Sequence, residues 1–330
     1  MPISPEFEQA LARLADTSAP LPPASLYQLS DLGRLDLAAL EAAWPGLAPD
    51  RRLAIVQDLS DISEANFEVN FDAIFRIGLE DESPAVRAAA IRGLWEAEDA
   101  SLAPVFLDFL RTDPEPQVRA AAASALGRFI YLGELEELPA AQLRRIEEAL
   151  LSVIAGLDEL EVRRRALEAM AYSSRPEVAA LIDEAYASDE ILMRISAIFA
   201  MGRTANSRWA EAVEAELSSP DAELRFEAVR AAGELELSEA ADALAALTQD
   251  EDTQVREAAI WSLSQVGGTV ARDALSQLLD ATEDEAEQDF IQDALENLEF
   301  TTDMEEFSLF DFEPDDEAGS DDDDEEEDDN

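Results

Sequence analysis

Side chains that could do covalent or metal chemistry are few in this chain. It has no Cys and no His, and its 23 basic residues are all Arg. A chain without Cys has no thiolate nucleophile, disulfide or Cys-based metal site, and one without His has no Ser triad of the usual kind. Asp and Glu number 76 in 330 residues, so no carboxylate pair stands out. We therefore predict no catalytic residue, no metal site, no cofactor and no enzymatic activity.

Arginine is the remaining side chain with distinctive chemistry, and it recurs at regular spacing. Near-copies of the segment AELRFEAVRAAG (222–233) run through the chain, each with an Arg after an apolar residue. The intervals between these Arg are 32, 44, 31, 31 and 31 residues, a period that predicts stacked repeats. We name these residues the anchor arginines: Arg87, Arg119, Arg163, Arg194, Arg225 and Arg256.

Two helices are predicted for each repeat. The first has an amphipathic pattern, as in APVFLDFLR (103–111). A short turn follows, as in TDPEP (112–116), whose Asp and Pro suit helix capping and the first helical turn. The second helix carries the anchor arginine. The 44-residue interval contains extra residues near 131–142, which we expect to lengthen the link and the next first helix.

The anchor arginines are expected to be structural. At about 100° per residue, positions −1, +3, +4 and +7 from each anchor share one helix face, and these positions are apolar or small, as in VRAAAIRGL (86–94). The Arg stem then packs within this face, while its head pairs with a turn Asp such as Asp113, Asp189 or Asp221. A ligand role for an anchor arginine is the alternative.

The motif of an apolar residue, Arg and then A-x-x-A-L-G, after a turn with Asp and often Pro, resembles the HEAT-repeat family. Its 31-residue period is similar to the short form found in proteins related to phycobilin lyases. The resemblance covers about residues 36–298 and implies an all-α, right-handed α-solenoid of about seven to eight helix pairs. We expect an N-terminal cap and Pro-rich segment at 1–35, the repeats at 36–299 and a disordered acidic tail at 300–330.

The HEAT family includes a few enzymes, and two of them bear on this chain. Deoxyhypusine hydroxylase builds its di-iron site from His-Glu pairs, so the lack of His argues against that activity here. Phycobilin lyases hold a chromophore in a concave groove and need no single strong motif. The resemblance leaves a lyase-like role open.

In HEAT-type solenoids the second helices line the concave side, and residues near +2, +5 and +9 from the anchor face away from the core. These offsets define the predicted concave strip: Arg128, Arg165, Tyr172, Phe199, Arg203, Arg230 and Trp261. Exposed Arg and aromatic residues are enriched at binding hot spots, so the strip is a candidate surface for a protein partner. The alternative is that these Arg pair within their helices with Glu168, Glu227 and Glu234 and that the aromatic rings pack on the first helices.

The formal net charge is −53, and residues 300–330 hold 17 acidic residues and no Arg. Such a field repels nucleic acid and anionic lipid and favours a basic partner. An acidic, salt-adapted cytoplasm is the alternative explanation for the charge outside the tail. The tail mixes acids with Phe307, Leu309, Phe310 and Phe312, as short binding segments do. It could bind a basic partner, cover the concave strip or only aid solubility.

No stretch approaches the ~20 apolar residues of a membrane span, and the first 16 residues lack signal-peptide features. We expect a cytoplasmic protein that binds neither membrane nor nucleic acid. The predicted function is a non-enzymatic scaffold or adaptor that holds a protein partner on its concave face, with the tail recruiting a basic partner or shielding the groove. The alternative is a lyase-like or chaperone-like accessory that holds a chromophore or an unassembled subunit.

Overall fold

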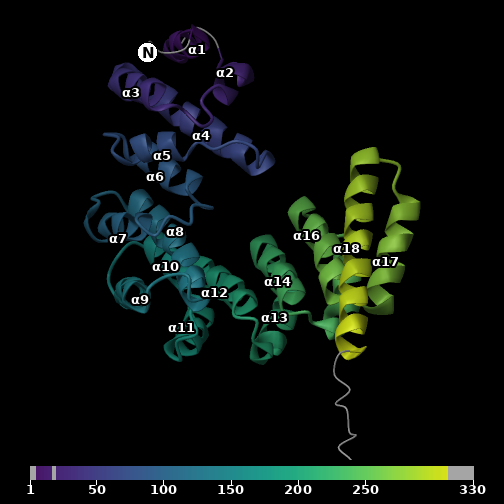
Figure 1. Ribbon diagram of the computed structural model, residues 1–330. Helices are drawn as coiled ribbons and strands as arrows, with labels where there is room; N and C mark the ends of the chain where they lie inside the picture. Colours follow the sequence, from purple (N-terminus) through teal and green to yellow (C-terminus); the bar gives the residue numbers. More distant parts are fainter. Residues whose placement is uncertain (1–4, 17–19, 311–330) are drawn as a thin grey trace, which may run out of the picture. The chain divides into compact units, whose positions relative to one another are not determined.

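The structure is a computed structural model that describes residues 5–16 and 20–310. These residues form eighteen α-helices and three short 3-10 helices, and no strand occurs among them (Figure 1). The predicted all-α class is therefore confirmed.

Most of the helices form consecutive pairs, in which a first helix is followed by the helix that carries the anchor position. Two short helices, α1 (Pro5–Ala15) and α2 (Pro23–Tyr27), precede them. The eight pairs are α3 (Arg34–Ala43) with α4 (Pro49–Ala65), α5 (Asp72–Leu79) with α6 (Pro84–Gly93), α7 (Leu102–Thr112) with α8 (Pro116–Glu134), α9 (Ala140–Ile154) with α10 (Leu160–Met170), α11 (Glu177–Tyr186) with α12 (Ile191–Arg203), α13 (Ala210–Glu216) with α14 (Ala222–Glu234), α15 (Ala241–Leu247) with α16 (Thr253–Val266), and α17 (Gly268–Ala281) with α18 (Glu285–Phe310). The 3-10 helices are η1 (Trp44–Gly46), η2 (Ser207–Trp209) and η3 (Ser238–Ala240).

The turn residues start the second helix of each pair, as the sequence predicts. Pro49, Pro84 and Pro116 occupy the first turns of α4, α6 and α8, where a missing N–H costs nothing. Asp252 caps α16, because its carboxylate accepts hydrogen bonds from the N–H groups of residues 254 and 255. Local sequence therefore fixes where these helices begin.

The apolar face of each second helix forms the core between layers. Val86, Ala90, Ile91 and Leu94 are all buried. The small residue at +3 brings helices close together: a Cβ built on Gly78 of α5 would lie only 2.7 Å from Ala90 Cβ of α6. This spacing explains why a small side chain is needed at +3.

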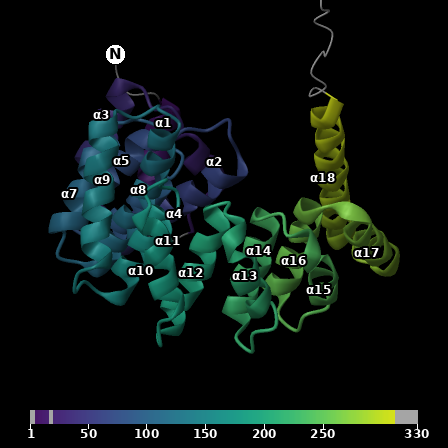
Figure 2. The same ribbon diagram turned by 90° about the horizontal axis from the view of Figure 1, so that it is seen from below.

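Two compact units divide the chain, residues 1–231 and 232–330, with the division inside α14. In the first unit the second helices α4, α6, α8, α10 and α12 pack on one another in chain order (Figure 1). In the second unit α16 packs against α15, α17 and α18, and α17 and α18 lie side by side in both views (Figures 1 and 2). The sequence predicted the helix pairs but not this division.

Two helices are longer than the sequence suggested. Part of the extra length in the 44-residue interval extends the second helix α8, which has 19 residues. The following first helix, α9, has 15 residues, and a long helix was expected there. Helix α18 continues to Phe310, because residues 300–310 contain no Pro or Gly. The expected boundary between repeats and tail at residues 299 and 300 stays a prediction. Phe312 and the acidic run 321–329 lie outside the described residues.

Candidate partner-binding site

The anchor arginines bond two turns at once. In Arg87, Nη1 donates to the carbonyl oxygens of Asp81 and Glu82 in the turn before its own helix, at 2.9 and 3.1 Å. Its Nε and Nη2 donate to the two carboxylate oxygens of Asp113, in the turn of the next repeat, at 2.9 and 3.1 Å. This fork is the geometry in which Arg binds a carboxylate most strongly. One side chain therefore joins two layers.

The same arrangement occurs in the neighbouring repeats. Arg119 donates to the carbonyl of Asp113 at 2.9 Å and to both carboxylate oxygens of Asp158, with the shorter bond at 2.6 Å. This hydrogen bond is the main cause of the lowered pKa of Asp158 and of the raised pKa of Arg119. In the first repeat, buried Arg52 bonds Asp81 and Glu82. We call the series Arg52–Asp81, Arg87–Asp113 and Arg119–Asp158 the Arg–Asp ladder.

Beyond Arg119 the bonds of the anchor arginines vary, although Arg225 and Arg256 donate to a turn carbonyl six residues earlier, as Arg87 and Arg119 do. Arg163 donates to the carbonyl of Ile154 at 3.2 Å, and within the described part of the chain no carboxylate bonds it. Arg194 pairs with Glu216 at 2.7 Å and lies over the Tyr186 ring. Arg225 and Arg256 donate to turn carbonyls at 2.8 Å, those of Ser219 and Asp250. Of the turn Asp named from sequence, Asp113 bonds an anchor side chain, and Asp221 accepts the N–H groups of residues 223 and 224.

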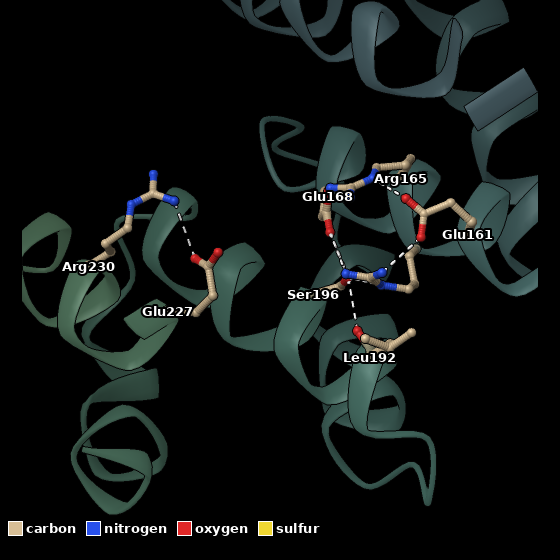
Figure 3. Close-up of polar contacts among 8 residues, drawn as sticks. Glu161, Arg165, Glu168, Leu192, Ser196, Glu227 and Arg230 are labelled. Atoms are coloured by element: carbon tan, nitrogen blue, oxygen red, sulfur yellow. Dashed lines mark hydrogen bonds and ion pairs between the residues drawn. The ribbon is translucent and has the colours of Figure 1, made fainter. Parts of the chain in front are cut away.

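A buried polar network takes the place of the ladder between α10 and α12 (Figure 3). The Ser196 hydroxyl donates to Glu168 Oε1 at 2.6 Å, and Arg164 Nε donates to Ser196 Oγ at 3.0 Å. Ser196 is fully buried, and Arg164 and Glu168 are buried beside it. Arg164 also donates to Glu161 at 2.8 Å. The layer in which anchor Arg163 has no bonded carboxylate is thus joined through the adjacent residue, Arg164.

A groove lies on the second helices of the first unit. Its volume is about 660 Å³, and it is lined by Glu64, Ile91, Arg92, Trp95, Ala121, Ser124, Ala125, Arg128, Tyr131, Tyr172 and Arg203. We call it the Arg–aromatic groove, because arginine and aromatic side chains supply most of its large surfaces. Three members of the predicted concave strip, Arg128, Tyr172 and Arg203, come together in it.

The cations of the groove differ in their surroundings. Arg128 is half-buried, pairs with Glu98 through Nη2 and lies over the Tyr131 ring at 5.5 Å. Arg92 is exposed, and no carboxylate in the described ranges bonds it. The surrounding protein still displaces part of its hydration, and this burial lowers its pKa. Arg92 is therefore charged, partly desolvated and open to a ligand.

The aromatic rings form a second feature of the groove. Trp95 and Tyr131 keep 48% and 42% of their surface exposed, far more than core rings such as Phe75 at 1%. Tyr131 meets Tyr172 edge to face, with 6.3 Å between ring centroids. Trp95 and Tyr131 each lie three residues after a groove arginine, Arg92 and Arg128, so each pair shares one side of its segment.

Other members of the concave strip lie apart from the groove lining. Arg165 donates to Glu161 at 2.8 Å and to Glu168 at 2.7 Å (Figure 3). Burial acts to lower the pKa of Arg165, but these carboxylates outweigh it and raise the pKa. Arg230 bonds Glu227 at 3.4 Å. Arg165 and Arg230 therefore pair with glutamates of their own helices, which the sequence analysis gave as the alternative to a binding surface.

Phe199 joins two more strip arginines. The guanidinium carbons of Arg203 and Arg230 lie 5.3 and 5.9 Å from its ring centroid, within the range of cation–π attraction. Trp261 is 41% exposed on α16 and belongs to the second unit. Phe307, Leu309 and Phe310 lie in the part of α18 where only the backbone is described.

The sequence offsets missed Trp95 and Tyr131. Tyr131 lies in the additional part of α8, and Trp95 follows the last residue of α6 by two positions. Neither falls on the offsets that the regular repeats suggested. The signal that was present is the three-residue spacing from Arg92 and Arg128.

Residues 5–16 and 20–310 contain no cluster of three or more Asp and Glu that could hold a metal ion. In the same ranges, no helix combines the length and apolar character needed to span a bilayer.

Known proteins and protein families resemble this chain in sequence pattern and in fold. The model of HEAT repeats matches residues 73–144 and 210–299. The complex of CpcE and CpcF of phycocyanin lyase from Nostoc sp. PCC7120 is similar in structure, with 17% identity, a TM-score of 0.50, and coverage of 81% of this chain and 96% of that one. No curated protein matches the chain.

Two further solved structures are similar at lower TM-scores. Human deoxyhypusine hydroxylase has 19% identity, a TM-score of 0.35, and coverage of 89% of this chain and 96% of its own. The Kap95:Nup1 complex has 12% identity, a TM-score of 0.44, and coverage of 89% and 46%. The matched repeats, the paired helices and the likeness to the CpcE–CpcF fold agree with one another. The chain therefore contains HEAT repeats, at residues 73–144 and 210–299.

Proposed function

We propose that this chain is a non-enzymatic scaffold or adaptor that holds a partner protein against the second helices of its first unit. The observation that carries the proposal is the Arg–aromatic groove, where Arg92, Arg128 and Arg203 gather with three aromatic rings. Arginine and aromatic side chains contribute most to binding energy at protein interfaces, and here several of them remain accessible. CpcE and CpcF, whose fold is similar, form a complex of two proteins.

Photo-crosslinking from the groove tests this proposal. A photoreactive amino acid is placed at Ser124, an exposed residue of the groove lining, and in a control at Val105, which is exposed on the first helix α7. We expect position 124 to crosslink to a defined protein in cells and position 105 not to do so. Arg92→Glu combined with Arg203→Glu should reduce the adduct. Equal adducts at both positions, or none at 124, would contradict the proposal.

The acidic tail has a separate place in this proposal. Its run 321–329 consists only of Asp and Glu, which supports the recruitment of a basic partner by charge. Replacing these residues by Asn and Gln keeps the chain length and removes the charge. We expect the partner captured at position 124 to be recovered less, and the loss to match that caused by high salt. Recovery that is unchanged by both treatments would show that the tail has no such role.

A small-molecule ligand is the second candidate, because the groove volume of about 660 Å³ falls in the range of such sites. The function would then be that of a lyase-like or chaperone-like accessory that holds a chromophore or an unassembled subunit. Absorption spectra and native mass spectra of the purified chain test this. A bound compound that is lost on Arg92→Ala and Arg128→Ala would replace the scaffold proposal. The cytoplasmic location stays a prediction.

A further inference from the structure

The Arg–aromatic groove has a local charge opposite to that of the chain. The chain carries a formal charge of −53, yet the groove lining has three Arg and one acidic residue, Glu64. Arginine tends to pair with carboxylates wherever they are near, and 76 acidic residues make such pairs easy to form in this chain. Three arginines gather in the groove against this background, and one of them, Arg92, is exposed and bonds no carboxylate within the described residues.

Arg92 and Arg128 retain bonding capacity. Arg92 is exposed in the groove lining, and within the described residues no carboxylate bonds it, so its donors are available to a ligand. Arg128 uses Nη2 for Glu98, and within the described residues its Nη1 makes no hydrogen bond. Both side chains would gain bonds from a carboxylate in the groove.

The aromatic rings define the rest of the ligand. Trp95, Tyr131 and Tyr172 offer flat apolar surface beside the two guanidinium groups. Arg128 already lies over the Tyr131 ring, so a cationic ligand approaching that ring would meet a like charge. Apolar or aromatic ligand side chains carry no such penalty and pack edge to face or offset against the rings.

We infer that the Arg–aromatic groove binds an extended peptide segment of the partner protein in which carboxylates alternate with aromatic or large apolar side chains. This inference rests on the proposed function and specifies the chemistry of its partner. Carboxylates bond Arg92 and Arg128, and the neighbouring apolar side chains pack on Trp95 and Tyr131. A nucleic acid is also anionic, but a long polyanion meets the repulsion of the whole chain, whereas a few carboxylates meet mainly the local arginines.

Fluorescence anisotropy with the full chain tests the inference. The probe is a labelled peptide of sequence SEFDLFEG. Its controls are SQFNLFQG, which lacks the charges, SEADLAEG, which lacks the rings, and a single-stranded oligonucleotide of equal length. We expect the probe to bind and every control to bind at least about tenfold more weakly, because each control peptide lacks one class of contact and the oligonucleotide is repelled by the charge of the chain.

Variants of the chain locate the binding. Arg92→Ala and Arg128→Ala should each raise the Kd of the probe about tenfold, because each substitution removes one charge-assisted contact. The matched control is Arg76→Ala, because Arg76 is an exposed arginine on α5 that pairs with Asp99 outside the groove lining. Glu98→Gln removes the carboxylate that pairs with Arg128 and should tighten binding several-fold. Such a gain cannot come from unfolding.

The outcomes separate this inference from the proposed function. Tighter binding of SQFNLFQG, SEADLAEG or the oligonucleotide overturns the inference, as does probe binding that Arg92→Ala, Arg128→Ala and Glu98→Gln leave unchanged. If no peptide binds, the inference is also wrong. The crosslink from Ser124 reports on the scaffold proposal independently: an adduct at 124 with failure of the acidic probe means that a protein of different chemistry occupies the groove.

Discussion

Arg87 holds the carboxylate of Asp113 in a two-bond fork, although the two residues belong to different repeats. Asp113 accepts hydrogen bonds from two anchor arginines: its carboxylate bonds Arg87, and its backbone carbonyl bonds Arg119. Asp81 is shared in the same way by Arg52 and Arg87. The consequences for stability can be measured residue by residue.

Arg87→Met should destabilise the first unit. Met keeps an apolar stem but leaves Asp113, which is buried, without its cation. We expect a loss of about 2 to 3 kcal/mol in the free energy of unfolding, measured by urea denaturation. Arg76→Met, which removes an exposed pair with Asp99, is the control and should change little. Equal effects of the two substitutions would contradict a structural role for the ladder.

Ser196→Ala tests the network between α10 and α12. The substitution removes a fully buried hydroxyl that donates to Glu168 at 2.6 Å and accepts from Arg164. We expect a loss of about 2 kcal/mol, because two buried polar groups lose a partner. Ser218→Ala removes an exposed hydroxyl and serves as the control. If Ser196→Ala unfolds at the same urea concentration as the parent chain, the network does not stabilise this layer.

Gly93→Ala tests close packing at the end of α6. The added Cβ would lie 2.5 Å from Cε1 of Phe75, a ring that is 1% exposed and has little room to move. Overpacking of this kind costs about 1 to 3 kcal/mol, so the melting temperature should fall. At Gly46 a Cβ meets nothing within 4 Å, so Gly46→Ala is a matched control that should leave the melting temperature unchanged. A larger fall in melting temperature for Gly46→Ala than for Gly93→Ala would contradict close packing at Gly93.

The Asp158 carboxylate predicts a pH dependence. Its hydrogen bond from Arg119 lowers its pKa below 3.8, so its charged form is favoured in the folded chain. The resulting stability is fully present above the unfolded pKa of about 3.9 and is lost as the pH falls through the folded pKa. The stability difference between the parent chain and Asp158→Asn should therefore shrink below about pH 4. A difference that stays constant from pH 6 to pH 3 would argue against the coupling.

The part of the fold that could be predicted from the sequence is the part that repeats. The anchor spacing and the face at −1, +3, +4 and +7 predicted the helix pairs and their buried residues, such as Val86 and Ile91. Each of these depends on contacts within a repeat or with the next one, which the sequence pattern records directly. The end of α8 packs against α9, and the end of α18 lies beyond the last repeat, so the repeat pattern predicted the length of neither helix.

The candidate site was predicted only in part, for a physical reason. Arg128, Tyr172 and Arg203 came from offsets on regular helices, and they line the groove. Whether an arginine at such an offset is accessible depends on the acids around it, as Arg165 shows with Glu161 and Glu168. With carboxylates so frequent, the sequence alone does not distinguish a paired arginine from an accessible one.

The extra length of α8 has a consequence for how such a protein acquires a specific surface. Tyr131 stands near the end of α8, where the extra residues of the 44-residue interval begin, and this end is supported by α9, where Leu143 fills the space beside Gly133. Shortening this interval to 31 residues would preserve the stacking pattern while removing one aromatic wall of the groove. The uniform repeats supply a scaffold that tolerates such insertions, and a single irregular unit then distinguishes this solenoid from others built on the same motif.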